Sequence, residues 1–153
     1  MTTVLDRIAR SDRSRFVNRP FGVYDNIQRT HAEGVEFAIG LRPVDALTVS
    51  ANVSYIDAEN RTPGTAFRTD LLRRPKETAA FVVDYRLPFG LGIGGTVQIV
   101  GDSFDSDSYG SRVRVDGYAL ASVRAELPIG DRLSIYGRID NVTDARYQTV
   151  AEY

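Results

Sequence analysis

The chain has 153 residues, a length typical of about one domain, and its 19 basic and 20 acidic residues leave a net charge of −1. That balance provides no positive field for sequence-independent binding of nucleic acid. The absence of cysteine and the single histidine exclude disulfides, thiolate metal sites and multi-histidine metal centres. No apolar run reaches the roughly 18 residues of a membrane-spanning helix, whereas the alternating strands of a transmembrane β-barrel stay compatible with this composition.

The first residues of the chain do not resemble an export signal. Residues 1–7 lack the basic region, apolar stretch and small-residue cleavage site that a secretory signal peptide combines. We therefore expect either a protein that stays inside the cell or a chain whose residue 1 is not the true start.

Apolar side chains recur at every second position through most of the chain, which is the period of a β-strand with one apolar face. These positions are Val35, Phe37, Ile39, Leu41, Leu47, Val49, Ala51, Val53, Tyr55, Phe81, Val83, Tyr85, Leu87, Leu91, Ile93, Val97, Ile99, Leu133, Ile135 and Ile139. Val82 and Val100 interrupt the pattern. The alternation predicts an all-β fold, an antiparallel up-and-down meander of about seven long strands that start near residues 2, 24, 46, 74, 91, 115 and 132.

Short and long connections alternate between these strands. Residues 42–45, 88–90 and 128–131 form short turns rich in Pro, Gly and Asp, whereas residues 57–71 and 102–114 form long polar loops. Outer-membrane barrels have such plain turns at one end and long external loops at the other. Several runs extend over about 11 to 15 residues, closer to a bilayer-spanning strand of about 9 to 11 than to an average soluble strand of about 5 to 6.

Alternation alone leaves open whether the apolar face points to lipid or into the dry core of a sandwich. The charged and hydroxyl side chains of the other face suit a hydrated barrel interior or a solvent-facing sheet, and we expect Asp84 and Arg86 to pair across strands. Aromatic residues near the strand ends are either a membrane-interface girdle or ordinary strand aromatics. They are Tyr55, Tyr85, Phe89 and Phe104.

Two local motifs are more specific than the periodicity. In residues 71–76, Leu-Leu-Arg-Arg-Pro-Lys, the proline lacks a backbone donor and therefore marks the beginning of a strand. Its cations Arg73, Arg74 and Lys76 either meet headgroup or lipopolysaccharide phosphates at the membrane rim or form a solvated loop cluster. In residues 138–147, Asn141 and Asp144 are expected to close an Asx-type turn.

These motifs resemble the C-terminal barrel region of TonB-dependent outer-membrane receptors, in particular the cobalamin and siderophore receptor-like branch. Asn141, Asp144 and Tyr147 match the family pattern Asn-Leu-Phe-Asp-x-x-Tyr, in which Val142 and Thr143 replace Leu and Phe. The block Ala-Glu-Gly-Val-Glu at residues 32–36, after Asn-Ile at residues 26–27, is similar to another strand of that family. The resemblance covers roughly residues 2 to 153.

The resemblance implies that residues 1–153 are one partial domain of a 22-stranded outer-membrane β-barrel, with the plug domain and the last strand absent. It also implies a place in the bacterial outer membrane and a part in the uptake of a siderophore- or cobalamin-like nutrient. The implied partners are outer-membrane lipid and lipopolysaccharide, the rest of the receptor, the TonB complex through the missing plug, and the small nutrient ligand. With unpaired edges and no plug, the chain by itself is expected neither to close into a barrel nor to transport.

Residues of the two long loops are the candidate ligand contacts. They are Asn60, Arg61, Arg68, Asp105, Asp107, Tyr109 and Arg112. Asp102, Asp105 and Asp107 also invite a calcium interpretation, but the loop lacks the layout of an EF-hand and a plain acidic loop is the better explanation.

We find no nucleophile–base pair and no convergent carboxylate pair, so we predict no enzyme, no cofactor and no metal site. Two alternatives stay open from the residues alone. One is a small autonomous outer-membrane β-barrel with a structural or adhesion role, and the other is a soluble all-β binding module.

Overall fold

The computed structural model describes residues 13–17, 23–27, 29–61 and 69–151. Every regular element in these ranges is a β-strand, which confirms the all-β prediction. Within the same ranges, none of the segments is a helix of the length and hydropathy needed to cross a membrane.

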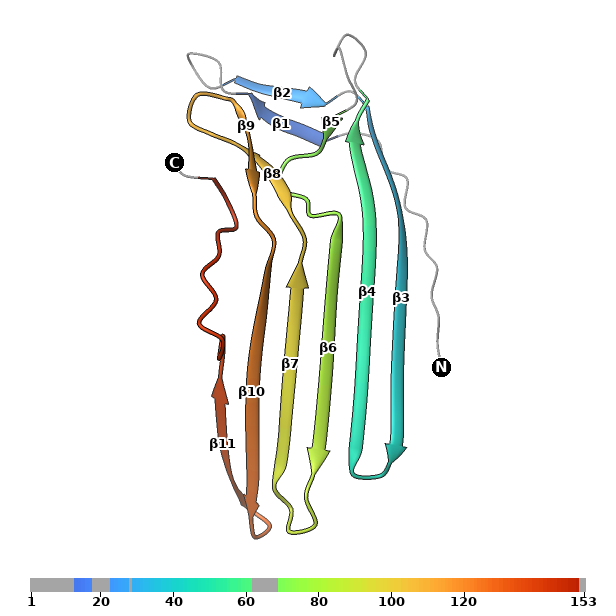
Figure 1. Ribbon diagram of the computed structural model, residues 1–153, viewed down its shortest axis with the longest axis vertical. Helices are drawn as coiled ribbons and strands as arrows, with labels where there is room; N and C mark the ends of the chain where they lie inside the picture. The colour runs from blue at the N-terminus through green and yellow to red at the C-terminus, as the bar shows by residue number, and fades with distance from the viewer. Residues whose placement is uncertain (1–12, 18–22, 28, 62–68, 152–153) are drawn as a thin grey trace.

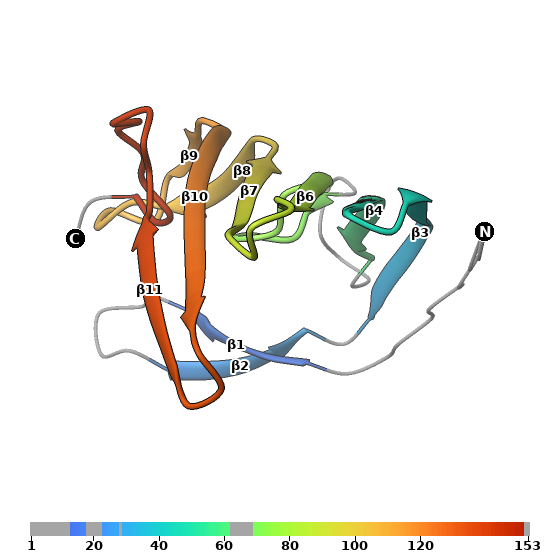
Figure 2. The ribbon, with the colours of Figure 1, turned by 90° about the horizontal axis from the view of Figure 1, so that it is seen from below.

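Six long antiparallel strands form one open sheet in the order β11-β10-β7-β6-β4-β3, with β3 and β11 at its edges (Figure 1). The strands are β3 (Thr30–Val44), β4 (Leu47–Asn60), β6 (Glu77–Arg86), β7 (Gly92–Val100), β10 (Tyr118–Ile129) and β11 (Leu133–Ile139), and the short β5 (Thr69–Asp70) pairs with β4. Each long strand pairs with the next long strand along the chain, so the predicted meander is confirmed. Seen from below, the sheet is a curved wall (Figure 2).

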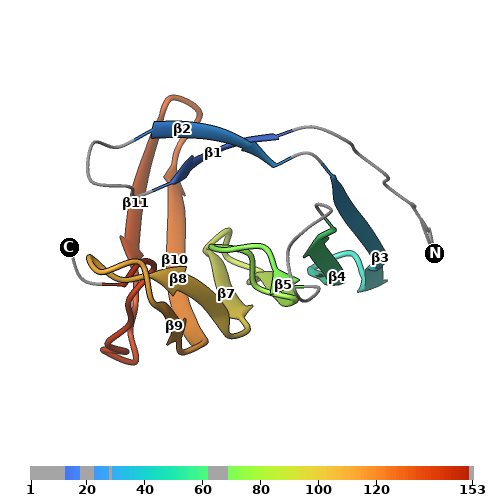
Figure 3. The same cartoon turned by 90° about the horizontal axis from the view of Figure 1, so that it is seen from above.

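Two small antiparallel sheets lie at the long-loop end of this wall. β1 (Arg13–Val17) pairs with β2 (Val23–Ile27), and β8 (Ser103–Ser106) pairs with β9 (Arg112–Val115). Figure 3 looks onto this end and shows the β1–β2 hairpin extending from the β3 side toward the β11 side. The sequence periodicity did not predict the β8–β9 hairpin, because its strands of four residues are too short to establish a period.

Most predicted strand starts agree with the structure to within a few residues. The starts near 46, 74, 91, 115 and 132 correspond to β4, β6, β7, β10 and β11. The start near 24 differs, because β2 covers that position and β3 begins only at Thr30. The strand expected near residue 2 lies outside the described residues.

The short turns follow from their Gly, Pro and Asp residues. Gly90, with a φ of 95°, donates its N–H to the Leu87 carbonyl at 2.9 Å and so closes the turn between β6 and β7. Pro43 lies where the β3–β4 register shifts, between Leu41 and Val44, so the missing N–H does not interrupt a regular ladder.

After a tight turn, residues 140–151 continue along β10 toward the long-loop end, and we call them the returning segment because they lead the chain back to that end (Figure 1). Asn141 accepts the Ala145 N–H at 3.0 Å and donates its side-chain amide to the Ala145 carbonyl at 3.1 Å. Its side chain therefore bonds to nearby backbone as predicted, but it reaches four residues ahead rather than the two of an Asx turn. Asp144 contributes a left-handed φ of 50° to the same turn. The ring of Tyr147 then stacks on Tyr118 of β10 with centroids 4.4 Å apart, which holds the returning segment against the wall.

Candidate functional site

Strand register places the alternating apolar residues in continuous rows across one face of the sheet. Val35 lies opposite Tyr55, and Phe81 lies opposite both Ala51 and Val97. Most of the large apolar side chains of these rows are between 39% and 62% exposed, whereas the buried hydrophobic residues of the described chain are Ala58 and Val115. The described residues therefore leave this face uncovered, which favours a lipid-facing surface over the dry core of a sandwich.

The apolar face becomes charged at the long-loop end. On β4 the apolar positions end at Tyr55, and the next residues of the same parity are Asp57, Glu59 and Arg61. The apolar part of the strand matches the roughly 9 to 11 residues that a tilted strand needs to cross a bilayer. Tyr55 and Tyr85 lie at opposite margins of this band, where interfacial aromatics occur.

The opposite face carries polar side chains that pair across strands. Arg124 of β10 reaches over β7 to the carboxylate of Asp84 on β6 and donates a second hydrogen bond to Thr96 at 3.2 Å. Asp84 thus pairs across strands as expected, but its partner is Arg124 and not Arg86. A Cβ at Gly94 would lie 2.4 Å from Asp84 Oδ1 and 2.8 Å from Arg124 Nε, so glycine makes room for the pair.

Polar side chains of this face also line a hollow near the short turns. Its lining includes Thr48, Asp84, Arg86, Arg124, Glu126 and Tyr136. The arrangement matches a hydrated barrel interior, because charged groups stay solvated there while the other face of the same strands meets lipid.

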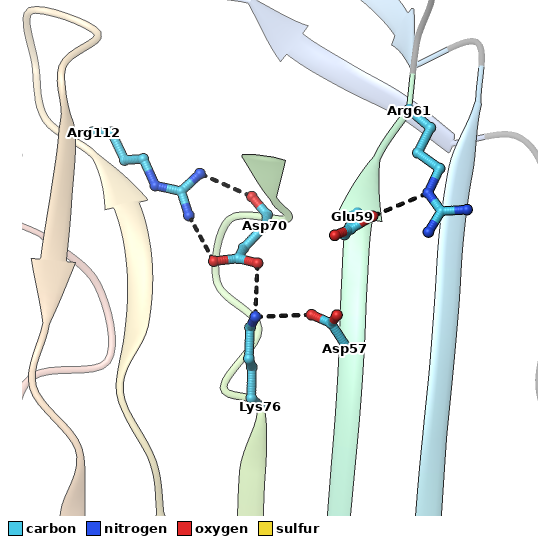
Figure 4. A network of polar contacts seen from close by, with 6 residues as sticks. All are labelled: Asp57, Glu59, Arg61, Asp70, Lys76 and Arg112. Atoms are coloured by element: carbon cyan, nitrogen blue, oxygen red, sulfur yellow. Dashed lines mark hydrogen bonds and ion pairs between the residues drawn. The ribbon is translucent and has the colours of Figure 1, made fainter. Parts of the chain in front are cut away.

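At the long-loop end, a lysine joins two carboxylates from different strands (Figure 4). Lys76 Nζ lies 2.8 Å from Asp57 Oδ1 and 2.9 Å from Asp70 Oδ1. Hydrogen bonds to Asp57 and then to Asp70 raise the pKa of Lys76 above its ordinary value. Arg112 of β9 donates to the Asp70 carbonyl at 3.0 Å and lies 3.3 Å from Asp70 Oδ2, so Asp70 joins β5 to the β8–β9 hairpin.

A second carboxylate, Asp105 of β8, is 2% exposed and collects three donors. Arg73 Nε donates to Oδ1 at 2.8 Å, the Ser106 N–H donates to Oδ1 at 2.8 Å, and the Ala151 N–H donates to Oδ2 at 2.9 Å. Burial acts to raise the pKa of Asp105, but the hydrogen bonds from Arg73, Ala151 and Ser106 outweigh it and hold that pKa below its ordinary value.

The structure separates the six candidate ligand contacts that it describes into exposed and engaged groups. Tyr109 is 93% exposed at the tip of the β8–β9 hairpin, and Asp107 beside it accepts the N–H groups of Tyr109 and Ser111 at 2.9 and 2.7 Å. Arg61 donates to Glu59 at 3.0 Å, and the guanidinium of Arg112 lies 3.9 Å above the ring of Phe104.

Two of the other three candidates are not exposed side chains of a loop surface. Asn60 is 9% exposed and Asp105 is buried, so neither offers a free side chain at the surface. Arg68 lies outside the described residues. Among the candidates, the structure brings together Asp105 and Arg112, which both hold the β8–β9 hairpin to residues 69–76.

The three aspartates of the 102–107 segment turn to separate partners. Asp102 accepts from Arg114 and from the Gly117 N–H at 2.8 Å, whereas Asp105 and Asp107 accept from the donors given above. In the part of the chain that the structure describes, no three His, Cys, Asp or Glu residues gather as a metal site.

The polar contacts at the long-loop end, which we call the rim, include two aspartates that sequence reasoning missed. They are Asp57 and Asp70. That reasoning placed Arg73 and Lys76 at the aqueous rim but named no carboxylate partners for them. One signal was available, because Asp57 and Glu59 continue the parity of an apolar row and so mark where that row ends.

Comparison with known proteins agrees with this geometry. Residues 2–142 match the family model described as TonB dependent receptor-like, beta-barrel. The crystal structure of the siderophore receptor PiuA from Acinetobacter baumannii aligns with a TM-score of 0.66 at 20% identity, over 79% of this chain and 19% of that one. The chain therefore spans about a fifth of that receptor's length, and the likeness shows a shared fold. The matched family comprises receptors rather than enzymes, and this chain belongs to the TonB-dependent receptor β-barrel family.

Proposed function

We propose that this chain forms part of the barrel wall of an outer-membrane receptor for TonB-dependent uptake of a scarce nutrient. The family match over residues 2–142 carries the proposal. The exposed apolar band, the polar opposite face and the alternation of short turns with long loops support it, because a bilayer-spanning wall requires all three.

In this proposal the chain contributes part of the barrel wall and its external loops, while the remaining strands and the plug of the receptor complete the transporter. The sheet is open at β3 and β11, so further strands are expected to pair with these edges in the membrane. A plug would connect the barrel to the TonB complex. The open sheet also argues against the alternative of a small autonomous barrel built from the described strands.

A ferric siderophore is the ligand class that we put first, ahead of cobalamin, because the aligned receptor PiuA is a siderophore receptor. Tyr109 is the foremost candidate contact, since its side chain is 93% exposed at the long-loop end. Asp107, Arg61 and Arg112 remain as secondary contacts, whereas the burial of Asp105 removes it from the proposed set.

Outer-membrane lipid is the proposed partner of the apolar band, with lipopolysaccharide at the long-loop margin. Arg73 and Lys76 are paired with carboxylates, while Arg74 is exposed beside them. Arg74 is therefore the cation of this motif that we propose for a lipopolysaccharide phosphate.

Uptake by intact cells tests the proposal. A strain that lacks the gene is grown under iron limitation, and entry of radiolabelled ferric siderophores and of labelled cobalamin is measured with and without the restored gene. We expect the restored gene to recover uptake of a ferric siderophore, and Tyr109→Ala to slow that uptake. Phe89→Ala, which truncates an exposed aromatic at the short-turn end, is the matched control and should leave uptake unchanged. Equal uptake of both ligand classes with and without the gene contradicts the proposal.

A further inference from the structure

Three segments far apart in the sequence meet at the long-loop end. They are residues 69–76 before β6, the β8–β9 hairpin at residues 103–115, and the end of the returning segment at residue 151. We propose that residues 69–76 act as a strap that locks the other two segments and β4 into one coupled unit, so the external loops of this wall move together. The inference concerns loop mechanics and holds whichever ligand the receptor takes.

The strap is fixed to the wall by its backbone and by Lys76. The Leu71 N–H donates to the Ala58 carbonyl at 2.8 Å, and the Ile56 N–H donates to the Lys76 carbonyl at 2.8 Å. The ion pair of Lys76 with Asp57 lies beside these bonds. Both ends of the strap are therefore attached to β4.

The same strap is fixed to the β8–β9 hairpin at two points. Arg73 donates its backbone N–H to the Phe104 carbonyl at 2.6 Å and its side chain to Asp105 at 2.8 Å. Arg112 reaches back to the carbonyl and carboxylate of Asp70 (Figure 4). Its guanidinium also covers the ring of Phe104. These contacts join residues 32 and 42 positions apart, so they cannot arise from local chain geometry.

The third segment, which ends at residue 151, is attached to the other two through Asp105. Its Oδ2 accepts the Ala151 N–H at 2.9 Å while Oδ1 holds Arg73. Because this carboxylate is 2% exposed and holds both donors at once, its removal would break the direct link between the Ala151 N–H and Arg73. Asp105 therefore couples the returning segment to the strap.

The ion pairs of Lys76 and the carboxylate of Asp105 are the two hubs of the strap. They differ in solvent exposure, and this difference makes the coupling testable. The side chains of Asp57 and Asp70 are 37% and 29% exposed, so each ion pair is individually weak, while Asp105 is buried. Asp57 pairs with Lys76 of the strap, and Lys76 and Asp70 connect it to Arg112 of the hairpin. A change at Asp57 that loosens the hairpin would therefore be the signature of coupling.

Amide hydrogen exchange on the whole receptor in outer-membrane vesicles tests the inference. Asp105→Asn should raise exchange about tenfold in residues 69–76, 103–115 and 146–151 together, as expected when a hydrogen bond to a charged group is lost. Asp57→Asn should raise exchange about threefold in both the strap and the hairpin, because the exposed ion pair contributes less.

Asp84→Asn is the matched control, since it breaks a partly exposed aspartate–arginine pair within the wall but outside the strap. It should leave exchange at the long-loop end unchanged. If Asp105→Asn prevents assembly, Arg112→Lys keeps the charge while losing the forked contact to Asp70, and it should loosen the strap and the hairpin alike. An increase confined to the mutated segment, in Asp57→Asn or in Arg112→Lys, overturns the proposal.

Discussion

The apolar band and the long-loop end of this wall are held together by different forces. In the band, paired strands satisfy the backbone and leave most large apolar side chains of the rows 39% to 62% exposed, which the proposed lipid environment would cover. At the long-loop end, hubs such as Asp70 and Asp105 join short strands and loops. The band therefore depends on its solvent, whereas the rim depends on specific side-chain partners.

The largest expected effect comes from placing a charge in the band. Val82 and Val83 are adjacent valines of β6 that point to opposite faces, and Val83 is 43% exposed on the apolar face. Val83→Arg should cost about 1 to 3 kcal/mol of unfolding free energy in lipid vesicles, because arginine is unfavourable inside the bilayer and Val83 lies between its centre and the margin at Tyr85. Urea titration of the receptor in vesicles measures this cost.

Val82→Arg provides the comparison for that experiment, because it places the same side chain on the polar face. Its cost should be well below that of Val83→Arg. Equal costs for the two variants would contradict the assignment of one face to lipid and the other to a hydrated interior.

The regular part of the wall was predictable because one rule governs it. The alternation from Leu47 to Tyr55 determines which face each residue of β4 occupies, and the turn at Pro88 and Gly90 sets where β6 ends. Those local features are sufficient for the strand order, since each long strand pairs with its neighbour in the chain.

The rim was not predictable in the same way, because its contacts are long-range and polar. Nothing local to Asp105 indicates that Arg73 and Ala151 will donate to it, since these residues lie 32 and 46 positions away. Asp105 and Arg112 were named as loop candidates from residue type alone, and their partners required the structure. Asp70 was missed for the same reason.

Acid should loosen the rim before it affects the band. The lowered pKa of Asp105 means that its stabilising contribution is complete above the ordinary carboxyl pKa and is lost as pH falls through the lower folded value, below about pH 4. Protonation weakens bonds to Arg73 and Ala151, and about 1 to 3 kcal/mol of local stability is at stake.

Hydrogen exchange of residues 103–115 between pH 6 and pH 3, corrected for the intrinsic exchange rate, follows this loss. The Asp105→Asn variant should already exchange rapidly at pH 6 and should lack the additional acid-induced opening. A variant whose pH profile matches that of the original protein would show that another group controls the acid response.

Adjacent glycines of β7 test the pairing on the polar face. A Cβ at Gly94 meets Asp84 and Arg124, whereas one at Gly95 comes no closer than 3.9 Å, to the Ser122 carbonyl. Gly94→Ala should therefore be about 1 kcal/mol less stable than Gly95→Ala, since both gain the same strand preference but only one displaces an ion pair. Urea unfolding in vesicles compares the two, and equal stability would mean that the Arg124 pair contributes nothing.

The smallest effect is expected at the short-turn end, where an ion pair stands alone. Arg42 and Asp45 approach to 3.9 Å with side chains 65% and 106% exposed, so solvent screens their attraction. Arg42→Gln should change the unfolding free energy by less than about 0.5 kcal/mol, because an isolated surface pair contributes little.

Two double-mutant cycles compare this pair with the network at the long-loop end. One combines Arg42→Gln with Asp45→Asn, the other combines Lys76→Gln with Asp57→Asn, and each measures the coupling energy of its pair directly. The cycle at Lys76 should give the larger value, because Asp70 holds the same ammonium group in place and less side-chain entropy remains to be lost. Equal coupling at the two sites would mean that the long-loop network adds no cooperativity to its separate ion pairs.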